Sequence, residues 1–436
     1  MCASCISLDT DWYPMPFPDE RPVDSDISRG GNEEARNVML LYSAGYTVSL
    51  PSYLKEDIED LAAGWLPGNL RNDNVLLVYS HLPVRNSDLS TPTSPVLFRL
   101  YSDEKGMAVR DTLRVYEAGT ISASAAQLEE VLTFVKDEFP ANGYGMIFSS
   151  HATGYLPSGY YNNPEEFMSV RKGRQRIPSP VPYVEPEHDP SLPAVKSIGA
   201  DISSIGGTRV SYEMELKDFA GAIPMELDYI LFDACLMGGV EAAYELRGVC
   251  KAVGFSQTEV LAEGFDYKTL STHLLGGRTP DPAAVCEDYF LQYDTQSGVY
   301  RSATISLVSP MMMDNLADVC SELFEKYRNG LSMIDPESVQ QYFRYSYHWF
   351  YDMESIIHRA AEAAGATQEE IGRDMEALHE ALDRCILYKA ATPRFMETFT
   401  IETYSGLSMY LPCDGSPYLD MHYRYLKWNE ATGLVK

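Results

Sequence analysis

Apolar runs, each long enough for one buried strand, constrain the fold of this chain more than any other feature. "NVMLLYSA" (37–44) and "NVLLVYSHL" (74–82) are two such runs. The segment between them, "YLKEDIEDLAAGWL" (53–66), has the apolar spacing of a helix. A strand, a helix and a second strand in succession predict an α/β fold.

The same alternation continues along the chain. Ser124 and Gln127 form a capping pair that predicts the start of a helix, and Pro140 ends it. "YGMIFSS" (144–150) and "LDYILFD" (227–233) are the next buried strands. We expect further strands at 94–102, 251–259 and 301–308, and further helices at 214–224, 240–249, 316–327 and 367–386.

Three parts follow from this pattern. Residues 1–36 are rich in proline and charge and predict a tail; 37–310 carry the alternation; and 311–436 predict an α+β subdomain. Residues 155–208 are an exception within the second part, because they have six prolines between Pro178 and Pro193 and little periodicity, and they predict a long loop. The loop contains "RKGRQR" (171–176), a dense basic cluster in a chain of net charge −29.

Composition excludes some classes of function. A net charge of −29 repels phosphate backbones, so we expect no nucleic-acid partner. The sequence contains no run of 18 or more apolar residues, so we expect no membrane span. "ASC" ending at Cys5 resembles the tail of a bacterial lipobox, and an ordinary start with two incidental cysteines is the alternative. No cysteine spacing among the remaining six predicts a zinc site.

Reactive side chains end two of the predicted strands. His151 follows one, and Asp233-Ala234-Cys235 ends the other. Ligands of open α/β sheets bind beyond the carboxyl ends of the strands. A helix opening at about Met237 would lower the thiol pKa, and histidine is the usual partner of a cysteine nucleophile. Alternatively, each residue is only structural, because a cysteine ending a buried strand is more often a core residue.

Asp233 has two interpretations. Residues i and i+2 of an extended segment share a face, so its carboxylate would lie near Cys235 and raise the thiol pKa. Asp233 is either a helix N-cap or the floor of a pocket for a cationic side chain. A phosphatase with Asp233 as the nucleophile is weaker, because the second acid expected two positions later is Cys235.

Two blocks of sequence resemble a known family. "GMIFSSHATGYLP" and "LDYILFDACLMGGVEAAYELRGVCKAVGFSQTEVLAEGFDY" are similar to the signature blocks of the clostripain family of cysteine peptidases, in the clan of caspases, gingipains and legumains. "YSGLSMYLP" adds to the resemblance, which runs from about residue 37 to the end. It implies a caspase-like three-layer α/β sandwich with a mainly parallel sheet, a C-terminal α+β subdomain and cysteine endopeptidase activity.

The resemblance also implies roles for individual residues. His151 corresponds to the general base, Cys235 to the nucleophile and Asp233 to the carboxylate that receives Arg or Lys. The loop 256–267 would help to wall the cleft, with Ser256 and Glu259 as candidate substrate-binding residues. The backbone N–H groups of Ala152 and Cys235 would form the oxyanion hole. Ala152 replaces the usual glycine, so the hole forms only if its backbone angles suit a residue with Cβ.

Relatives are often cut between the histidine and the cysteine. We therefore expect self-processing after Arg171, Lys172, Arg174 or Arg176, or else a solvated charge run there. The resemblance implies peptide substrates, a monomer and an extracytoplasmic location, with a membrane link only through a lipid anchor. We expect no cofactor, since no compact acidic loop indicates calcium. The rival hypothesis is a catalytically inactive, clostripain-like surface binding protein.

Overall fold

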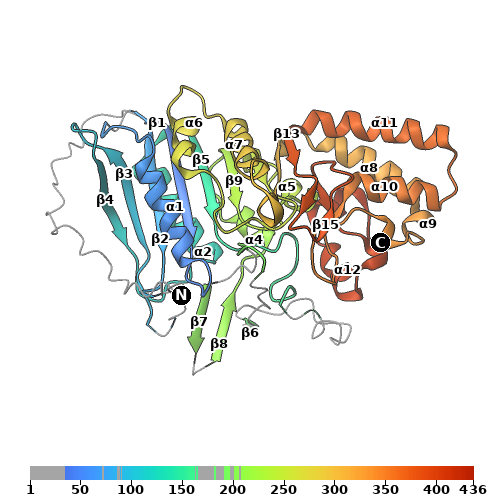
Figure 1. The fold of residues 1–436 in the computed structure, drawn as a ribbon, viewed down its shortest axis with the longest axis horizontal. Helices are drawn as coiled ribbons and strands as arrows, with labels where there is room; N and C mark the ends of the chain where they lie inside the picture. Colours follow the sequence, from blue (N-terminus) through green and yellow to red (C-terminus); the bar gives the residue numbers. More distant parts are fainter. Residues whose placement is uncertain are drawn as a thin grey trace, which may run out of the picture.

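A computed structural model describes the fold (Figure 1). It describes residues 35–70, 73–85, 89, 91–162, 164, 181–182, 191–196, 201–205 and 208–436. A nine-stranded sheet forms the centre of the molecule. Within the described part of the chain, no helix is both long and apolar enough to cross a membrane.

The central sheet has the strand order β13-β11-β10-β9-β5-β1-β2-β3-β4. Neighbours from β10 to β2 pair in parallel, while β3 and β11 run in the opposite direction to the rest. The prediction of a mainly parallel sheet is therefore confirmed. Its strands are β1 (Ala35–Ala44), β2 (Val75–His81), β3 (Val96–Ser102), β4 (Ala108–Val115), β5 (Ala141–Ser149), β9 (Leu227–Asp233), β10 (Cys250–Phe255), β11 (Thr304–Val308) and β13 (Ile386–Ala391).

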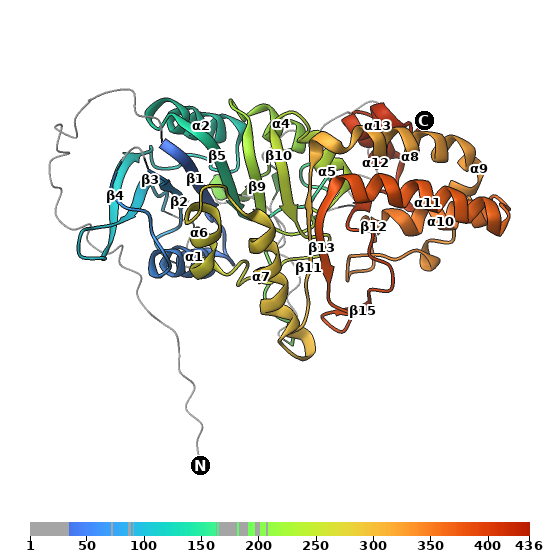
Figure 2. The same ribbon diagram turned by 90° about the horizontal axis from the view of Figure 1, so that it is seen from above.

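Helices cover both faces of this sheet and complete the three-layer sandwich. Figure 2 shows α2 and α4 on one face and α1, α6 and α7 on the other. The Ser124 side chain caps α2, as the sequence predicts. These helices are α1 (Pro51–Ala63), α2 (Ala125–Glu138), α4 (Leu216–Gly221), α6 (Tyr267–Leu275) and α7 (Pro282–Asp294), and the short α5 (Val240–Glu245) follows β9.

The C-terminal helices gather beside one end of the sheet (Figure 1). They are α8 (Asp314–Lys326), α9 (Arg328–Leu331), α10 (Met353–Ala363), α11 (Gln368–Cys385), α12 (Pro417–Tyr423) and α13 (Lys427–Thr432), with 3-10 turns at Gly298–Tyr300, Pro310–Met312, Pro336–Ser338 and Pro412–Asp414. The predicted Thr367–Glu370 capping box starts α11. Helix α11 ends at Cys385, and the next six residues form β13, which joins the central sheet.

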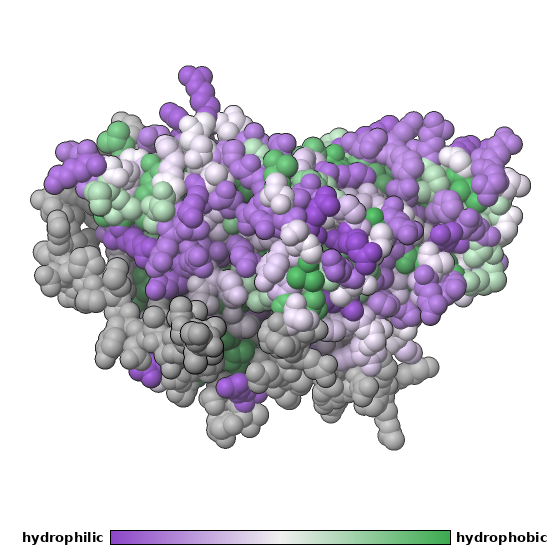
Figure 3. Space-filling model, in the orientation of Figure 1, coloured by the Kyte–Doolittle hydropathy of each residue, from purple (hydrophilic) through white to green (hydrophobic). Residues whose placement is uncertain are grey.

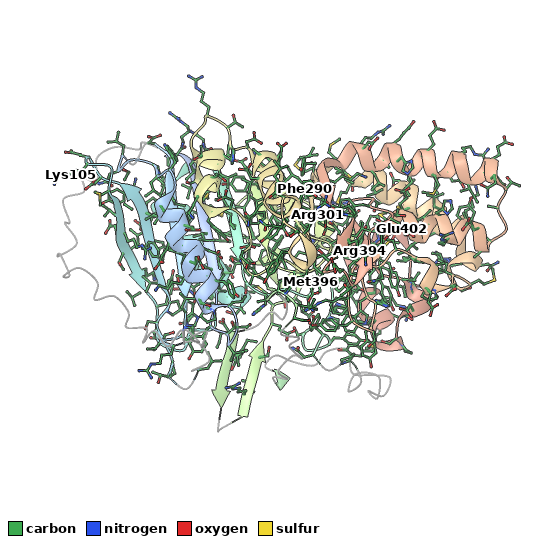
Figure 4. The ribbon with its side chains drawn as sticks, in the orientation of Figure 1. Lys105, Phe290, Arg301, Arg394, Met396 and Glu402 are labelled. Atoms are coloured by element: carbon green, nitrogen blue, oxygen red, sulfur yellow. The ribbon has the colours of Figure 1, made fainter. Side chains whose placement is uncertain are left out.

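Short strands complete the C-terminal part. β12 (Tyr351–Asp352) pairs with β16 (Ser408–Met409), and β14 (Arg394–Phe395) pairs with β15 (Phe399–Thr400). The N–H of Met396, in the β14–β15 turn, donates a hydrogen bond to Ser302 Oγ (2.6 Å). This bond ties the hairpin to the segment before β11; Figure 4 labels Met396 and Arg301, the residue before Ser302.

Two regions differ from the sequence expectation. β4 was not predicted, because its "AVRDTLRV" alternates at an exposed edge and has no continuous apolar run. The expected loop contains β6 (Val181–Pro182), β7 (Asp201–Ile205) and β8 (Thr208–Tyr212), which form a small antiparallel sheet. The β7–β8 hairpin projects below the central sheet in Figure 1. The face seen in Figure 3 is mainly hydrophilic, consistent with a net charge of −29.

Candidate active site

Strand register brings the two candidate reactive residues together. β5 pairs in parallel with β9, and Ser149 lies opposite Asp233 at the last pair of that ladder. His151 comes two residues after Ser149, and Cys235 comes two residues after Asp233. The two residues therefore follow adjacent strands at matching positions. The register therefore places both residues at the carboxyl edge of the sheet.

The Cys235 thiol is fully buried. Its sulfur accepts a hydrogen bond from the backbone N–H of Val260 at 3.0 Å. Burial, with the nearby Glu259 carboxylate, raises the pKa of the thiol well above its usual value. The thiol is therefore protonated in this state.

The expected effect of a helix dipole on Cys235 was wrong. Helix α5 begins at Val240, not at about Met237, and is only six residues long. The thiol pKa is raised, not lowered, and Glu259 is the carboxylate that raises it. The expectation failed because the residues between Cys235 and the helix form an extended turn. In that turn Leu236 N–H and Gly238 N–H donate to the carbonyls of the 256–258 segment.

His151 is buried and uncharged at neutral pH. Desolvation lowers its pKa to about 4, although the nearby Lys196 backbone opposes the shift. Ring atom Nε2 lies 3.4 Å from Ser49 Oγ, and Nδ1 has no hydrogen-bond partner among the described residues. A neutral imidazole can accept a proton from a thiol.

A short segment of the long loop lies across this site like a bound peptide. Val195 pairs antiparallel with Leu261. Lys196 N–H donates to Val260 O, and Ala262 N–H donates to Ala194 O, both at 2.9 Å. The backbone of Lys196 also contacts His151. Strand addition of this kind is a common way for a protein to bind an extended peptide.

The Lys196 side chain is fully buried beneath this segment. Its ammonium donates to Asp233 Oδ2, to Asp57 Oδ2 (3.2 Å) and to Ser149 Oγ (3.3 Å). Burial alone would lower the pKa of the ammonium, but the two carboxylates raise it above its usual value. The site therefore holds a charged lysine side chain.

Asp233 is the centre of this polar cluster. Its Oδ2 atom also accepts from Tyr267 OH (2.7 Å) and from Ser149 Oγ (3.2 Å). The N-cap of α5 is Gly239, so the helix-cap interpretation of Asp233 is wrong. Asp233 therefore contacts a buried cationic side chain of its own chain.

Ser256 and Glu259 lie beside the site in different ways. Ser256 is buried, and its hydroxyl pairs with Thr304 Oγ1 (2.9 Å) and Thr258 Oγ1 (3.2 Å), so any effect on a substrate is indirect. The Glu259 carboxylate pairs with Arg344, whose Nε lies 2.6 Å from Oε2. This ion pair fixes the start of the segment that pairs with Lys196.

Backbone angles at the candidate oxyanion hole do not require the missing glycine. The non-glycine residues with positive φ in the described chain are Leu236, Met396 and Glu397, so Ala152 has a negative φ. The positive φ falls instead on Leu236, directly after Cys235, and on Gly154 (φ 60°). A Cβ at Gly154 would lie 2.5 Å from Leu236 O, so glycine is needed there for close contact of the two loops.

Two residues at the site were missed from the sequence. Lys196 stands alone in the long loop, away from the basic cluster, and no spacing marks it. Asp57 carried a signal, because it shares the apolar face of its helix with Leu54 and Leu61. The expected cleavage candidates and the lipobox cysteine lie outside the described residues: Arg171, Lys172, Arg174, Arg176 and Cys5.

Comparisons with known proteins define the class. The model of the clostripain family matches residues 188–432, more than half of the chain. The chain therefore belongs to the clostripain family and is a cysteine peptidase. The rival hypothesis of an inactive surface binding protein is not favoured. A search of curated proteins found no match.

Solved structures share the whole fold. An inactive zymogen C11 protease from Parabacteroides distasonis is 25% identical, with a TM-score of 0.70, and the match covers 92% of this chain and 98% of that one. A secreted C11 cysteine protease from Bacteroides thetaiotaomicron is 22% identical (TM-score 0.68, 92% and 100% covered). A structure of a secreted C11 cysteine protease from the same organism in complex with an irreversible peptide inhibitor is 20% identical (TM-score 0.66, 91% and 99% covered). These likenesses support the caspase-like α/β fold.

Proposed function

We propose that this cysteine peptidase cleaves peptide bonds after a basic residue, through Cys235 and His151. One observation carries the proposal. Lys196 lies in the site as the residue on the amino side of a cleaved bond (P1) would lie, with its ammonium on Asp233 and its backbone paired with Val260. This contact supports a role for Asp233 in receiving P1 Arg or Lys.

The chemistry uses groups of this chain. His151, neutral above its lowered pKa, takes the thiol proton as Cys235 Sγ attacks the P1 carbonyl carbon. Backbone N–H groups of Ala152 and Cys235 stabilise the oxyanion. The C–N bond then breaks, and the imidazolium returns the proton to the leaving amine. Water attacks the resulting thioester, His151 takes a proton from the water, and the carboxylic acid product leaves with the thiol restored.

The same geometry supports self-processing at a position other than the basic cluster. Lys196 occupies the pocket that a substrate needs, so the uncut chain blocks its own site. A cut between Lys196 and Ser197 would free the segment on one side of the bond and open the pocket. We propose that the enzyme is made as a zymogen that activates itself by this cut.

A location outside the cytoplasm remains part of this proposal. It is supported by the description of the Bacteroides thetaiotaomicron relative as secreted. Peptides and proteins are the proposed substrates.

Paired peptides test the activity. Wild type and Cys235→Ala are incubated with fluorogenic peptides that share the sequence Ala-Val-P1, with Lys, Arg or Leu at P1. We expect wild type to release the fluorophore from the basic peptides only, and Cys235→Ala to release none. Equal turnover by the two proteins, zero included, would overturn the proposal.

A further inference from the structure

The described residues point to a finer specificity than a preference for basic side chains. We propose that the pocket selects lysine over arginine at P1, and that Asp57 of helix α1 is its second specificity-determining carboxylate. This inference rests on the peptide cleavage proposed above. It goes beyond that proposal by naming one side chain as the preferred P1 residue and a further residue that recognises it.

The number of acceptors matches an ammonium group. A lysine ammonium has three N–H donors. Three side-chain oxygens surround Lys196 Nζ within hydrogen-bond distance, one each from Asp233, Asp57 and Ser149. All three donors therefore have protein acceptors and need no water. A fully buried cation requires such complete hydrogen bonding.

The acceptors come from separate elements that enclose the ammonium. Asp233 and Ser149 end adjacent strands, whereas Asp57 comes from α1, which covers one face of the sheet. Asp57 is 6% exposed, and among the described residues Lys196 is its only ion-pair partner. A buried carboxylate aimed at one cation is costly unless that cation is bound, so Asp57 makes binding depend on the charge.

Gly264 closes the pocket beyond the ammonium. It has φ +63°, and a Cβ there would lie 2.7 Å from Lys196 Nζ and 2.5 Å from each oxygen of Asp233. Tyr293 OH donates to Gly264 O at 2.8 Å and holds this turn in place. The glycine backbone therefore fills the space that lies directly past the tip of a lysine side chain.

Arginine fits this enclosure poorly. Its guanidinium carbon would lie near the position of Lys196 Nζ, and its two terminal nitrogens would extend further. That space holds the carboxylates of Asp233 and Asp57 and the backbone of Gly264. The planar fork of arginine prefers a bidentate contact with one carboxylate. It could make that contact with Asp233 only if Asp57 or Gly264 moved.

Two measurements test selectivity on the unmodified pocket. The first compares kcat/KM of processed wild type for Ala-Val-Lys and Ala-Val-Arg fluorogenic peptides, and we expect at least about a tenfold preference for lysine. The second compares the self-cutting rate of wild type with that of Lys196→Arg, which we expect to be slower by a similar factor. Equal rates in both would overturn the selectivity, while turnover of both peptides would leave the proposed function intact.

Asp57 is tested with a matched neighbour. Asp57→Asn removes the charge, and Glu56→Gln makes the same change at an exposed position of the same helix. Variants that do not cut themselves are first cut with a trace of tagged wild type, which is then removed. Loss of a charged hydrogen bond should lower kcat/KM for the lysine peptide about 10- to 100-fold in Asp57→Asn and reduce the Lys:Arg ratio. Glu56→Gln should keep both values.

The outcomes separate specificity from folding and from activity. Alkylation of Cys235 by iodoacetamide in the processed variants reports an intact site independently of P1. Asp57→Asn that is alkylated like wild type and keeps the wild-type Lys:Arg ratio would overturn the role of Asp57. Should Asp57→Asn fail to fold, the Lys196→Arg rate and the wild-type peptide ratio still decide the selectivity. If neither basic peptide nor the chain itself is cut by wild type, the proposed function fails first.

Discussion

Replacing Lys196 with methionine in the uncut chain should destabilise it strongly. Lys196→Met keeps most of the apolar stem and removes the ammonium that Asp57 and Asp233 share. The change is made in Cys235→Ala, so that no chain is cut during the measurement. Two buried carboxylates then face each other without a counter-charge.

The size of the effect can be worked out from the charges. Removing one partner of a buried ion pair typically costs about 3–5 kcal/mol. The chain can limit this cost by protonating Asp57, whose pKa burial already raises. Protonating a carboxyl with an unfolded pKa of about 3.9 at about pH 7 costs about 4 kcal/mol, at about 1.4 kcal/mol per pH unit. We therefore expect a loss of about 4 kcal/mol near neutral pH.

The sign of the pH dependence follows from the same argument. Without the ammonium, the folded state binds a proton that the unfolded state releases above about pH 4. The loss in free energy of unfolding caused by Lys196→Met should therefore shrink as pH falls from about 7 to about 5. Urea unfolding at several pH values measures it.

Two further variants separate this pair from general effects of lysine loss. Adding Asp57→Asn to Lys196→Met should recover much of the lost stability, because one buried charge no longer needs neutralising. Lys268→Met is the control, since Lys268 pairs with Asp60 at 3.2 Å on the surface and should change stability by about 1 kcal/mol or less. If Lys196→Met lost no more stability than Lys268→Met, or if its loss grew as pH fell, the ammonium would not be neutralising the two buried carboxylates.

Two other predictions concern stability and assembly. Burial raises the pKa of Glu241 to about 7. The contribution of Glu241 to the free energy of unfolding of wild type should therefore fall as pH rises from about 4.5 to about 7. Glu241→Gln keeps an acceptor for Tyr410 N–H and Tyr423 OH. It should raise the melting temperature relative to wild type more at about pH 8 than at about pH 5. An equal rise at the two pH values would contradict this prediction. After a cut at Lys196, β5 and β9 belong to different fragments but remain neighbours in the central sheet. The fragments should co-elute in native gel filtration and separate only in denaturant; separation in native buffer would contradict this.

Much of the sheet could be predicted because its strands are buried on both faces. The continuous apolar runs of β1, β2, β5 and β9 mark strands covered by helices. β4 lacks that mark, because an edge strand with an exposed face reads as an alternating polar segment. Strand β13 was hidden at the end of a helix, where no proline or glycine signals the change.

The candidate site was predictable only where the sheet itself positions the residues. Parallel strands bring their carboxyl ends together, so His151, Asp233 and Cys235 could be predicted to lie near one another. Lys196 reaches the site through a loop, and its place depends on tertiary pairing with the 260–262 segment rather than on local sequence. The thiol pKa also depends on that tertiary burial, which is why a helix-dipole argument gave the wrong direction.

The intact mass of the purified chain shows whether the protein cuts itself after Lys196. Wild type and Cys235→Ala are incubated side by side, and the masses of the products are compared. We expect wild type to give two fragments, one that ends at Lys196 and one that begins at Ser197. We expect Cys235→Ala to stay uncut. Wild type that stays uncut, is cut only elsewhere, or is cut no more than Cys235→Ala would contradict these expectations.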